Sequence, residues 1–157
     1  MHSPANVTDI MTKDAIVVTT STPLVEAAEI LNVHKINGVP VVDGDNILVG
    51  ILTEYDLISK GSAIHLPTLQ AIFQNLSVMR EDRSRFEKET REIMSLTVKD
   101  VMNDDPLTLP LDASFDDVVA AFRDHHRVNP IPVIDKNRKV VGVVSRCDVL
   151  KLFHALK

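Results

Sequence analysis

The chain has 157 residues, of which 45% are hydrophobic, only 4% are aromatic and none is tryptophan, so the composition predicts a folded domain with an aliphatic core and excludes a disordered chain. The formal net charge of −5 argues against broad nucleic-acid binding, which requires a basic surface. The chain has one cysteine, no signal-peptide pattern at its N-terminus and no apolar stretch near the roughly 20 residues that span a bilayer, so we expect a soluble cytoplasmic protein without membrane insertion.

The sequence contains one unit twice. Three segments of the first half recur in the same order in the second: Val7–Met11 as Val98–Met102, Pro40–Asp43 as Pro132–Asp135, and Gly50–Asp56 as Gly142–Asp148. Repeated units of this kind bury faces against each other, and two related clefts are expected where the halves meet. We expect a first repeat over residues 1–60, a helical connector over 61–96 and a second repeat over 97–157.

Within the first repeat, the apolar run at 16–18 is rich in β-branched residues and predicts a strand. Apolar residues at helical spacing over 24–31 predict a helix after it. Two further strands, at 39–42 and 47–52, are separated by polar, turn-forming residues, which indicates a hairpin. A final helix is expected to begin near Thr53.

The connector fits neither repeat and is expected to be helical, because Phe73 and Leu76 belong to a series of apolar residues spaced for one helix face. Charges of both signs alternate over 79–89, which is typical of a solvated helix. One interpretation is a plain helical connector. The other is an arm that contacts a partner or a second copy of the chain, with Phe73, Leu76 and Phe86 on its buried side.

The second repeat predicts the same order of elements. A short apolar run at 107–109 precedes a helix that Ser114 caps, because a hydroxyl there with an acidic residue three positions later resembles a capping box. Strands are expected at 131–134 and 139–144, again as a hairpin, with a last helix from about Ser145. Each unit is therefore strand-helix-strand-strand-helix, and the fold class is α+β.

Each last helix follows a motif of a glycine, two apolar residues, a hydroxyl, two variable residues and an aspartate. The hydroxyls of Thr53 and Ser145 can cap the helices, beside backbone N–H groups that favour phosphate. The carboxylates of Asp56 and Asp148 can each accept two hydrogen bonds from a vicinal diol such as ribose. The same pattern is also a capping box that needs no ligand, but its recurrence after a glycine in both repeats favours a ligand site.

With these motifs in this order, the chain resembles a tandem pair of CBS domains (cystathionine β-synthase domains), the Bateman module. The resemblance covers all but the connector and the extreme ends. It is carried by Asp9–Met11 and Asp100–Met102, by Pro40–Asp43 and Pro132–Asp135, and by the two glycine-to-aspartate motifs. It implies two β-α-β-β-α repeats packed sheet to sheet about a pseudo-twofold axis, association of two modules as a homodimer, and regulation of an effector protein that the sequence does not identify.

The resemblance also implies that the clefts bind an adenosine-containing regulatory ligand: AMP, ADP, ATP or S-adenosylmethionine. In the family, the motif hydroxyl meets ribose or phosphate and the motif aspartate holds the ribose hydroxyls, which points here to Thr53 with Asp56 and to Ser145 with Asp148. The adenine ring lies against apolar residues and backbone at the strand starts. On this chain those positions are Asn37, Gly38, Val39, Pro40, Asn129, Pro130, Ile131 and Pro132, with Ile16 and Leu107 as apolar walls.

The two clefts differ in charge, because Arg146 follows Ser145 where Glu54 follows Thr53. If these side chains face the phosphates, Arg146 attracts them and Glu54 repels them. The sequence then predicts a charged nucleotide in the cleft of Ser145, and no ligand or a less anionic one in the cleft of Thr53. The alternative is that both variable side chains point to solvent.

No motif indicates an enzyme, because the chain has no Ser-His-Asp order, no glycine-rich phosphate loop and no HExxH pattern. The histidines show no metal-finger spacing, so neither catalytic residues nor a metal site is expected. His125, His126 and Arg127 form a small basic cluster, and the better interpretation is that His125 or Arg127 reaches a ligand phosphate. Two alternatives to a ligand sensor stay open: a ligand-free dimerisation scaffold of the same fold, and a detached regulatory piece of a larger enzyme or transporter.

Overall fold

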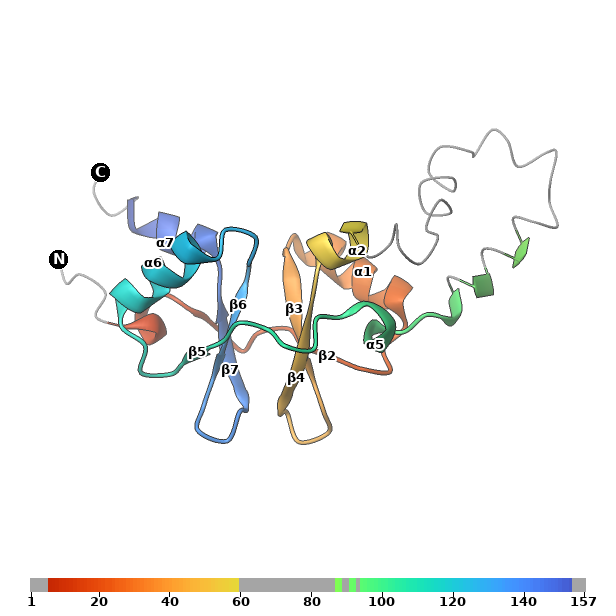
Figure 1. The fold of residues 1–157 in the computed structure, drawn as a ribbon, viewed down its shortest axis with the longest axis horizontal. Coiled ribbons are helices and arrows are strands. Elements are labelled where there is room, and N and C mark those ends of the chain that lie inside the picture. The colour runs from red at the N-terminus through yellow and green to blue at the C-terminus, as the bar shows by residue number, and fades with distance from the viewer. Residues whose placement is uncertain (1–5, 60–86, 89–90, 93, 154–157) are drawn as a thin grey trace.

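The structure, a computed structural model, describes residues 6–59, 87–88, 91–92 and 94–153 (Figure 1). In the first half these residues form η1 (Val7–Asp9), β1 (Thr12–Lys13), β2 (Val18–Thr19), α1 (Leu24–His34), β3 (Gly38–Val42), β4 (Leu48–Thr53) and α2 (Glu54–Ser59). The second half forms α5 (Val98–Val101), β5 (Leu109–Pro110), α6 (Phe115–Asp124), β6 (Ile131–Ile134), β7 (Val140–Val144) and α7 (Arg146–Lys151). The predicted α+β class and the two strand-helix-strand-strand-helix repeats are confirmed.

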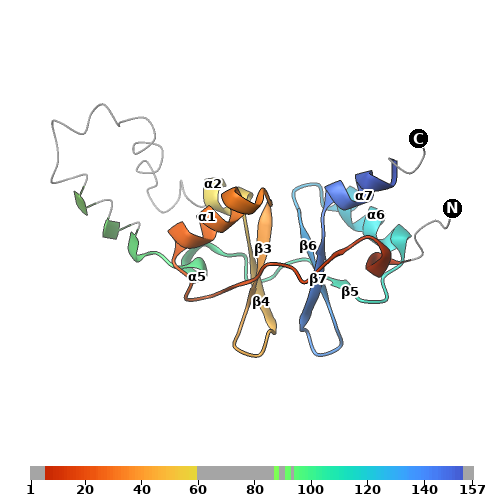
Figure 2. The same ribbon diagram turned by 180° about the vertical axis from the view of Figure 1, so that it is seen from behind.

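Two sheets lie side by side at the centre of the molecule, with the helices on their outer sides (Figures 1 and 2). In the first repeat β3 pairs in parallel with β2 and antiparallel with β4. In the second repeat β6 pairs in parallel with β5 and antiparallel with β7. The parallel pair in each repeat is connected through a helix, α1 or α6, which packs on the apolar face that the strands present.

The pseudo-twofold axis is visible in the pairing of equivalent residues. Ile47 forms an isolated bridge with Lys139, its own counterpart in the second repeat, where the two hairpins meet. Two other contacts between the repeats are equivalent to each other: Thr12 pairs with Val143 in one sheet, and Asn103, the counterpart of Thr12, bridges Ile51, the counterpart of Val143, at the other. The repeats are therefore related by a rotation that brings like elements together.

The leading segment of each repeat crosses to the other repeat and completes its core. β1 is an antiparallel edge strand on β7, and Val7 is fully buried in the core of the second repeat. In return, Val98 and Val101 of α5 are buried in the core of the first repeat. The cores therefore do not follow the sequence boundaries at residues 60 and 97, and β1 is an element that the sequence pattern did not predict.

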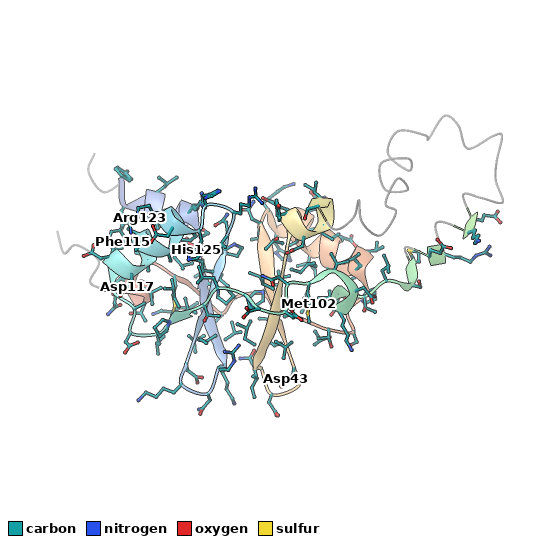
Figure 3. The ribbon with its side chains drawn as sticks, in the orientation of Figure 1. Asp43, Met102, Phe115, Asp117, Arg123 and His125 are labelled. Atoms are coloured by element: carbon teal, nitrogen blue, oxygen red, sulfur yellow. The ribbon has the colours of Figure 1, made fainter. Side chains whose placement is uncertain are left out.

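The crossing segments explain the glycine of each motif. A Cβ atom on Gly142 would lie 2.7 Å from the carbonyl oxygen of Thr12, and one on Gly50 would lie 2.8 Å from that of Asn103. The sulfur atoms of Met11 and Met102 would lie 2.9 Å from these positions, and Figure 3 shows Met102 beside β4. The glycines thus admit the backbone of the opposite repeat and not a ligand.

Helix boundaries follow the local sequence. Ser114 and Asp117 form the predicted capping box of α6, in which the Asp117 carboxylate accepts from the Ser114 N–H at 2.9 Å. α1 ends at His34 and is capped by Lys35, whose backbone is left-handed with φ of 54° and whose N–H donates to the carbonyls of Leu31 and Asn32. This turn places the Lys35 side chain at the junction of the repeats, next to β3.

Two predicted strands are shorter than expected. The strand at 16–18 is reduced to Val18–Thr19, and the strand at 107–109 is reduced to Leu109–Pro110. The reason is register: only these residues pair with β3 and β6, so Ile16 and Leu107 precede the sheets. Most of the connector, with Phe73, Leu76 and Phe86, lies outside the described residues; those described at 87–88, 91–92 and 94–95 are helical.

Candidate functional site

Two pockets where the repeats meet contain the motif residues, and each takes residues from both repeats. The Thr53 pocket has Thr53, Tyr55 and Asp56 of the first repeat and Leu107, Arg127, Asn129 and Pro130 of the second among its lining residues. The Ser145 pocket has Ser145, Cys147, Asp148 and Lys151 of the second repeat and Ile16, Lys35, Asn37 and Gly38 of the first. The cavity volumes are about 190 Å³ for the Thr53 pocket and about 430 Å³ for the Ser145 pocket.

The aspartate of the Ser145 pocket is buried, and both of its carboxylate oxygens accept hydrogen bonds. One carboxylate oxygen of Asp148 accepts from the Ser145 N–H and hydroxyl, both at 2.8 Å. The other accepts from Lys151 Nζ at 2.7 Å, and only 4% of the residue is exposed. This hydrogen bond and the negative charge of Asp148 raise the pKa of Lys151 above its ordinary value. The capping-box interpretation is thus realised, and Lys151 holds the second oxygen at the pocket wall.

The Thr53 pocket repeats this geometry on α2. One carboxylate oxygen of Asp56 accepts from the Thr53 N–H at 3.0 Å and from its hydroxyl at 2.6 Å, and 7% of Asp56 is exposed. Ser59 occupies the position that corresponds to Lys151 in the second repeat. The same hydroxyl-carboxylate pair therefore stands at the start of α2 and of α7, with different side chains one turn later.

Each pocket receives a cation from the opposite repeat. Lys35 and Arg127 occupy equivalent positions, two residues before Asn37 and Asn129, and each lines the pocket of the other repeat's motif. Arg127 is one of the two residues expected from the sequence to reach a phosphate, whereas Lys35 was not expected there. A signal was present, because the basic residue recurs at the same place in both repeats. His125, the alternative to Arg127, lines neither pocket.

Arg146 and Glu54 require a correction, because neither lines the Thr53 pocket or the Ser145 pocket. The guanidinium of Arg146 donates to the carbonyls of His126 and Val128 and stacks 5.5 Å from the ring centroid of Phe122. Carbonyls just past a helix end lack intrahelical partners and attract cations, which explains this orientation. The Glu54 carboxylate accepts from Asn37 Nδ2 at 2.7 Å. The charge difference expected from these two residues therefore does not reach the pockets.

The residues expected around adenine separate into two groups. Gly38, Asn37, Asn129 and Pro130 line the pockets, as do the two apolar walls Ile16 and Leu107. The other four are buried in the sheets and line neither pocket: Val39, Pro40, Ile131 and Pro132. Val39 and Ile131 belong to the two cores, whereas Pro40 and Pro132, the next residues of the same strands, point to the opposite faces of the sheets. The sequence pattern did not distinguish residues at the starts of β3 and β6, which line the pockets, from residues inside these strands, which do not.

Asn37 and Asn129, which are equivalent residues, form a hydrogen bond between the repeats at the pseudo-twofold axis. Asn129 Nδ2 donates to Asn37 Oδ1 at 3.3 Å, and Asn129 Oδ1 accepts from the Arg146 N–H at 3.0 Å. A Cβ atom on Gly38 would lie 2.8 Å from Pro130 Cδ, so this glycine allows the repeats to approach. A ligand in either pocket would therefore contact groups that also join the repeats.

A metal site and a membrane-spanning helix are the two other features considered for the described residues. These residues contain no group of three or more histidine, cysteine, aspartate or glutamate residues placed to hold a metal ion. No helix in the described part of the chain has both the length and the apolar character needed to cross a membrane.

Comparison with known proteins gives a family and several related structures. The family model for the CBS domain matches residues 7–62 and, a second time, residues 98–155. The protein named L-aspartate semialdehyde sulfurtransferase of Methanocaldococcus jannaschii is 32% identical over 158 residues, which cover 100% of this chain and 25% of that relative. The chain therefore spans a quarter of this relative's length, and the catalytic name describes a much longer protein.

Two similar solved structures contain bound ligands. The crystal structure of CBSX2 in complex with AMP has a TM-score of 0.70 and 25% identity, and the match covers 97% of this chain and 98% of that one. The CBS domain pair of protein MJ0100, in complex with 5′-methylthioadenosine and S-adenosyl-L-methionine, has a TM-score of 0.66 and 28% identity, with 94% and 98% covered. Both are similar to this chain over nearly their whole length.

Proposed function

This chain belongs to the CBS domain family, and from that premise we propose that it is a regulatory module whose inter-repeat pockets bind an adenosine-containing ligand. The observation that carries the proposal is the composition of each pocket. A buried carboxylate and a hydroxyl at a helix start, from one repeat, face a basic side chain and an apolar wall from the other. These groups match ribose, phosphate and an aromatic base in turn.

The Ser145 pocket is the better supported of the two. Its volume of about 430 Å³ lies within the range of small-molecule sites, which is about 300–1,000 Å³. Asp148 supplies the ribose acceptor, Lys35 and Lys151 supply cations, and the apolar Ile16 supplies a wall for the base. The complexes of CBSX2 with AMP and of MJ0100 with 5′-methylthioadenosine and S-adenosyl-L-methionine support ligands of this class. AMP, ADP, ATP and S-adenosylmethionine are the candidates.

The regulatory output follows from the position of the pockets between the repeats. A ligand that contacts both repeats favours the arrangement in which those contacts form, by its difference in affinity between arrangements. Apolar side chains on the outer helices are available to transmit this change to an effector or to a second copy in a homodimer. Ile58 of α2 is 77% exposed, and Leu150 of α7 and the nearby Phe153 are 58% and 64% exposed.

Two alternative functions each have a supporting observation. A ligand-free dimerisation scaffold is consistent with the capping roles of Asp56 and Asp148, which need no ligand. A regulatory piece of a larger enzyme is consistent with the archaeal relative, of which this chain spans a quarter. The first alternative excludes ligand binding, and the second does not.

The test is ligand binding to the purified chain. Native mass spectrometry first detects a co-purified ligand, and thermal unfolding is then followed with AMP, ADP, ATP and S-adenosylmethionine. A ligand at 100 times its Kd should add about 2.7 kcal/mol of stability. Asp148→Ala should abolish the response in the Ser145 pocket, whereas Arg146→Ala should retain it. A wild-type protein that responds to none of these ligands would leave the scaffold as the better description.

A further inference from the structure

A contact between the repeats lies across the Thr53 pocket. Arg127, which precedes β6 in the second repeat, places its guanidinium carbon 5.9 Å from the ring centroid of Tyr55 on α2. Its Nη1 also donates to the Tyr55 hydroxyl at 3.3 Å. Both side chains line the Thr53 pocket, so this pair narrows the pocket by joining its two walls.

The Ser145 pocket lacks such a contact. Cys147 occupies the position of Tyr55, and Lys35 occupies that of Arg127. Lys35 Nζ reaches back to Asn32 Oδ1 of its own helix at 3.5 Å, and no described contact joins it to Cys147. The volumes agree with this difference, because the pocket with the tyrosine-arginine pair measures about 190 Å³ and the other about 430 Å³.

The charges of the pair determine what can replace it. Within the described residues Arg127 makes no ion pair, and it contacts the hydroxyl and the aromatic face of Tyr55, both neutral. A phosphate can accept two parallel hydrogen bonds from a guanidinium, which is a stronger interaction than either present contact. An uncharged nucleoside has no phosphate for Arg127, so its binding would break the contacts between Arg127 and Tyr55 without forming new ones.

Resting on the proposed function, we infer that Tyr55 and Arg127 make the Thr53 pocket selective for adenosine ligands that carry an anionic group. The Ser145 pocket admits adenosine ligands with or without phosphate and fills first. The Thr53 pocket fills second, when the phosphate of the ligand takes Arg127 from Tyr55. Tyr55 is thus a specificity-determining residue, and the sequence difference between Tyr55 and Cys147 is the source of the asymmetry.

The experiment measures affinities of AMP and adenosine for the Thr53 pocket by isothermal titration, with the Ser145 pocket disabled by Asp148→Ala. Loss of an exposed cation–π contact corresponds to about a two- to fivefold change in affinity. Tyr55→Ala should raise the affinity for both ligands by this factor. Arg127→Ala should raise the affinity for adenosine by a similar factor but lower that for AMP about tenfold or more, because a charged hydrogen bond is lost.

Tyr55→Phe is the matched control, because it keeps the ring beneath Arg127 and removes only the hydroxyl. It should produce a smaller change than Tyr55→Ala. If Asp148→Ala does not fold, native mass spectrometry of the other variants with Asp148 intact counts the second bound ligand instead. At equal ligand concentrations, wild type should then carry a second AMP more often than a second adenosine, and Tyr55→Ala should raise the fraction with a second adenosine.

The outcomes separate this inference from the proposed function. If Arg127→Ala changes AMP and adenosine affinity in the same direction, or if Tyr55→Ala weakens binding, the pair is a structural or ligand-packing element and the selectivity is wrong. Binding at the Ser145 pocket would in that case still support the proposed function. If neither ligand binds wild type or any variant, the proposed function and the selectivity are both wrong.

Discussion

Helices α2 and α7 begin from the same capping box but continue with different side chains. Asp56 and Asp148 are both buried and both accept from the hydroxyl three residues earlier. The next turn then differs, since Lys151 contacts Asp148 in the second repeat where the first repeat has Ser59. The capping box sets the start of the helix in both repeats, and the residues around it give each pocket its own size and charge.

The features that both repeats share have structural roles in this chain. The motif glycines admit the crossing backbone, and the motif carboxylates satisfy helix N–H groups. Function must then be sought where the repeats differ while the geometry is the same. Those positions are Tyr55 against Cys147 and Arg127 against Lys35, all of which line the pockets.

The largest effect is expected from filling the space beside the motif glycines. Gly50→Val and Gly142→Val should each destabilise the protein by about 1–3 kcal/mol, because a Cβ atom meets a backbone carbonyl that cannot move without shifting the crossing segment. Urea unfolding measures the change. Similar losses in both repeats would show that the two crossings are equally tight, and a neutral variant at either site would contradict the close approach.

Gly44 provides the control for this pair. It lies in the turn between β3 and β4, and no atom lies within 4 Å of the position that its Cβ would take. Gly44→Val should therefore change the free energy of unfolding by less than about 0.5 kcal/mol, as is usual for surface substitutions. The contrast isolates the effect of the crossing segments from the general effect of replacing a glycine.

The sequence predicted the repeat architecture well because local signals agreed with the final structure. The helices from Leu24 and Phe115 and both hairpins were found from apolar spacing and turn residues. β1 was missed because the edge strand formed by Thr12 and Lys13 is two exposed residues long, and its partner lies in the other repeat. No local pattern encodes such a pairing.

The sequence located the two motifs at helix starts but did not give the directions of the side chains around them. Thr53, Asp56, Ser145 and Asp148 were found because their spacing defines a helix start. Arg146 was assigned to a phosphate from its position alone, and its guanidinium instead satisfies carbonyls at the end of α6. Direction depends on neighbours brought together by the fold, which the sequence order does not reveal.

The next largest effect is expected from removing the motif carboxylates. Asp56→Ala and Asp148→Ala should each cost about 0.5–2 kcal/mol, because the hydroxyl and N–H at the start of α2 or α7 lose their acceptor. Thermal unfolding without ligand measures this structural part, and titration with AMP measures the functional part. A loss of binding without any loss of stability would mean that the capping role is overestimated in that repeat.

A smaller effect is expected from the lysine that distinguishes the second repeat. Lys151→Ala should cost no more than about 1 kcal/mol, because its ammonium group is largely exposed and the ion pair with Asp148 is screened by solvent. The cost should fall in 1 M salt, where the Debye length is about 3 Å. In an Asp148→Ala background the same substitution should be neutral, and a cost that persists there would assign Lys151 to a different partner.

The smallest effect concerns the starts of α6 and α1, the other pair of equivalent helices. The hydroxyl and N–H of Ser114 lower the pKa of Asp117, whereas α1 begins after Pro23 without a side-chain cap. Because the folded pKa of Asp117 lies below its unfolded value near about 3.9, its contribution to stability is complete above that pH and disappears as the pH falls through the folded pKa. The carboxylates of Asp100 and Asp124 also have lowered pKa values, so only the difference between variant and wild type reports on Asp117.

Asp117→Asn should therefore reduce stability at pH 5 to 7 and make the loss of stability below about pH 4 shallower than in wild type. Urea unfolding at each pH measures this difference, and carbon NMR of the Asp117 carboxyl group locates its titration directly. Hydrogen exchange at the first turns of α6 and α1 then compares the two starts. Between neutral and acid pH, hydrogen-exchange protection should decrease more at the first turn of α6 than at that of α1. An equal decrease at both would show that the capping box does not control how these helices begin.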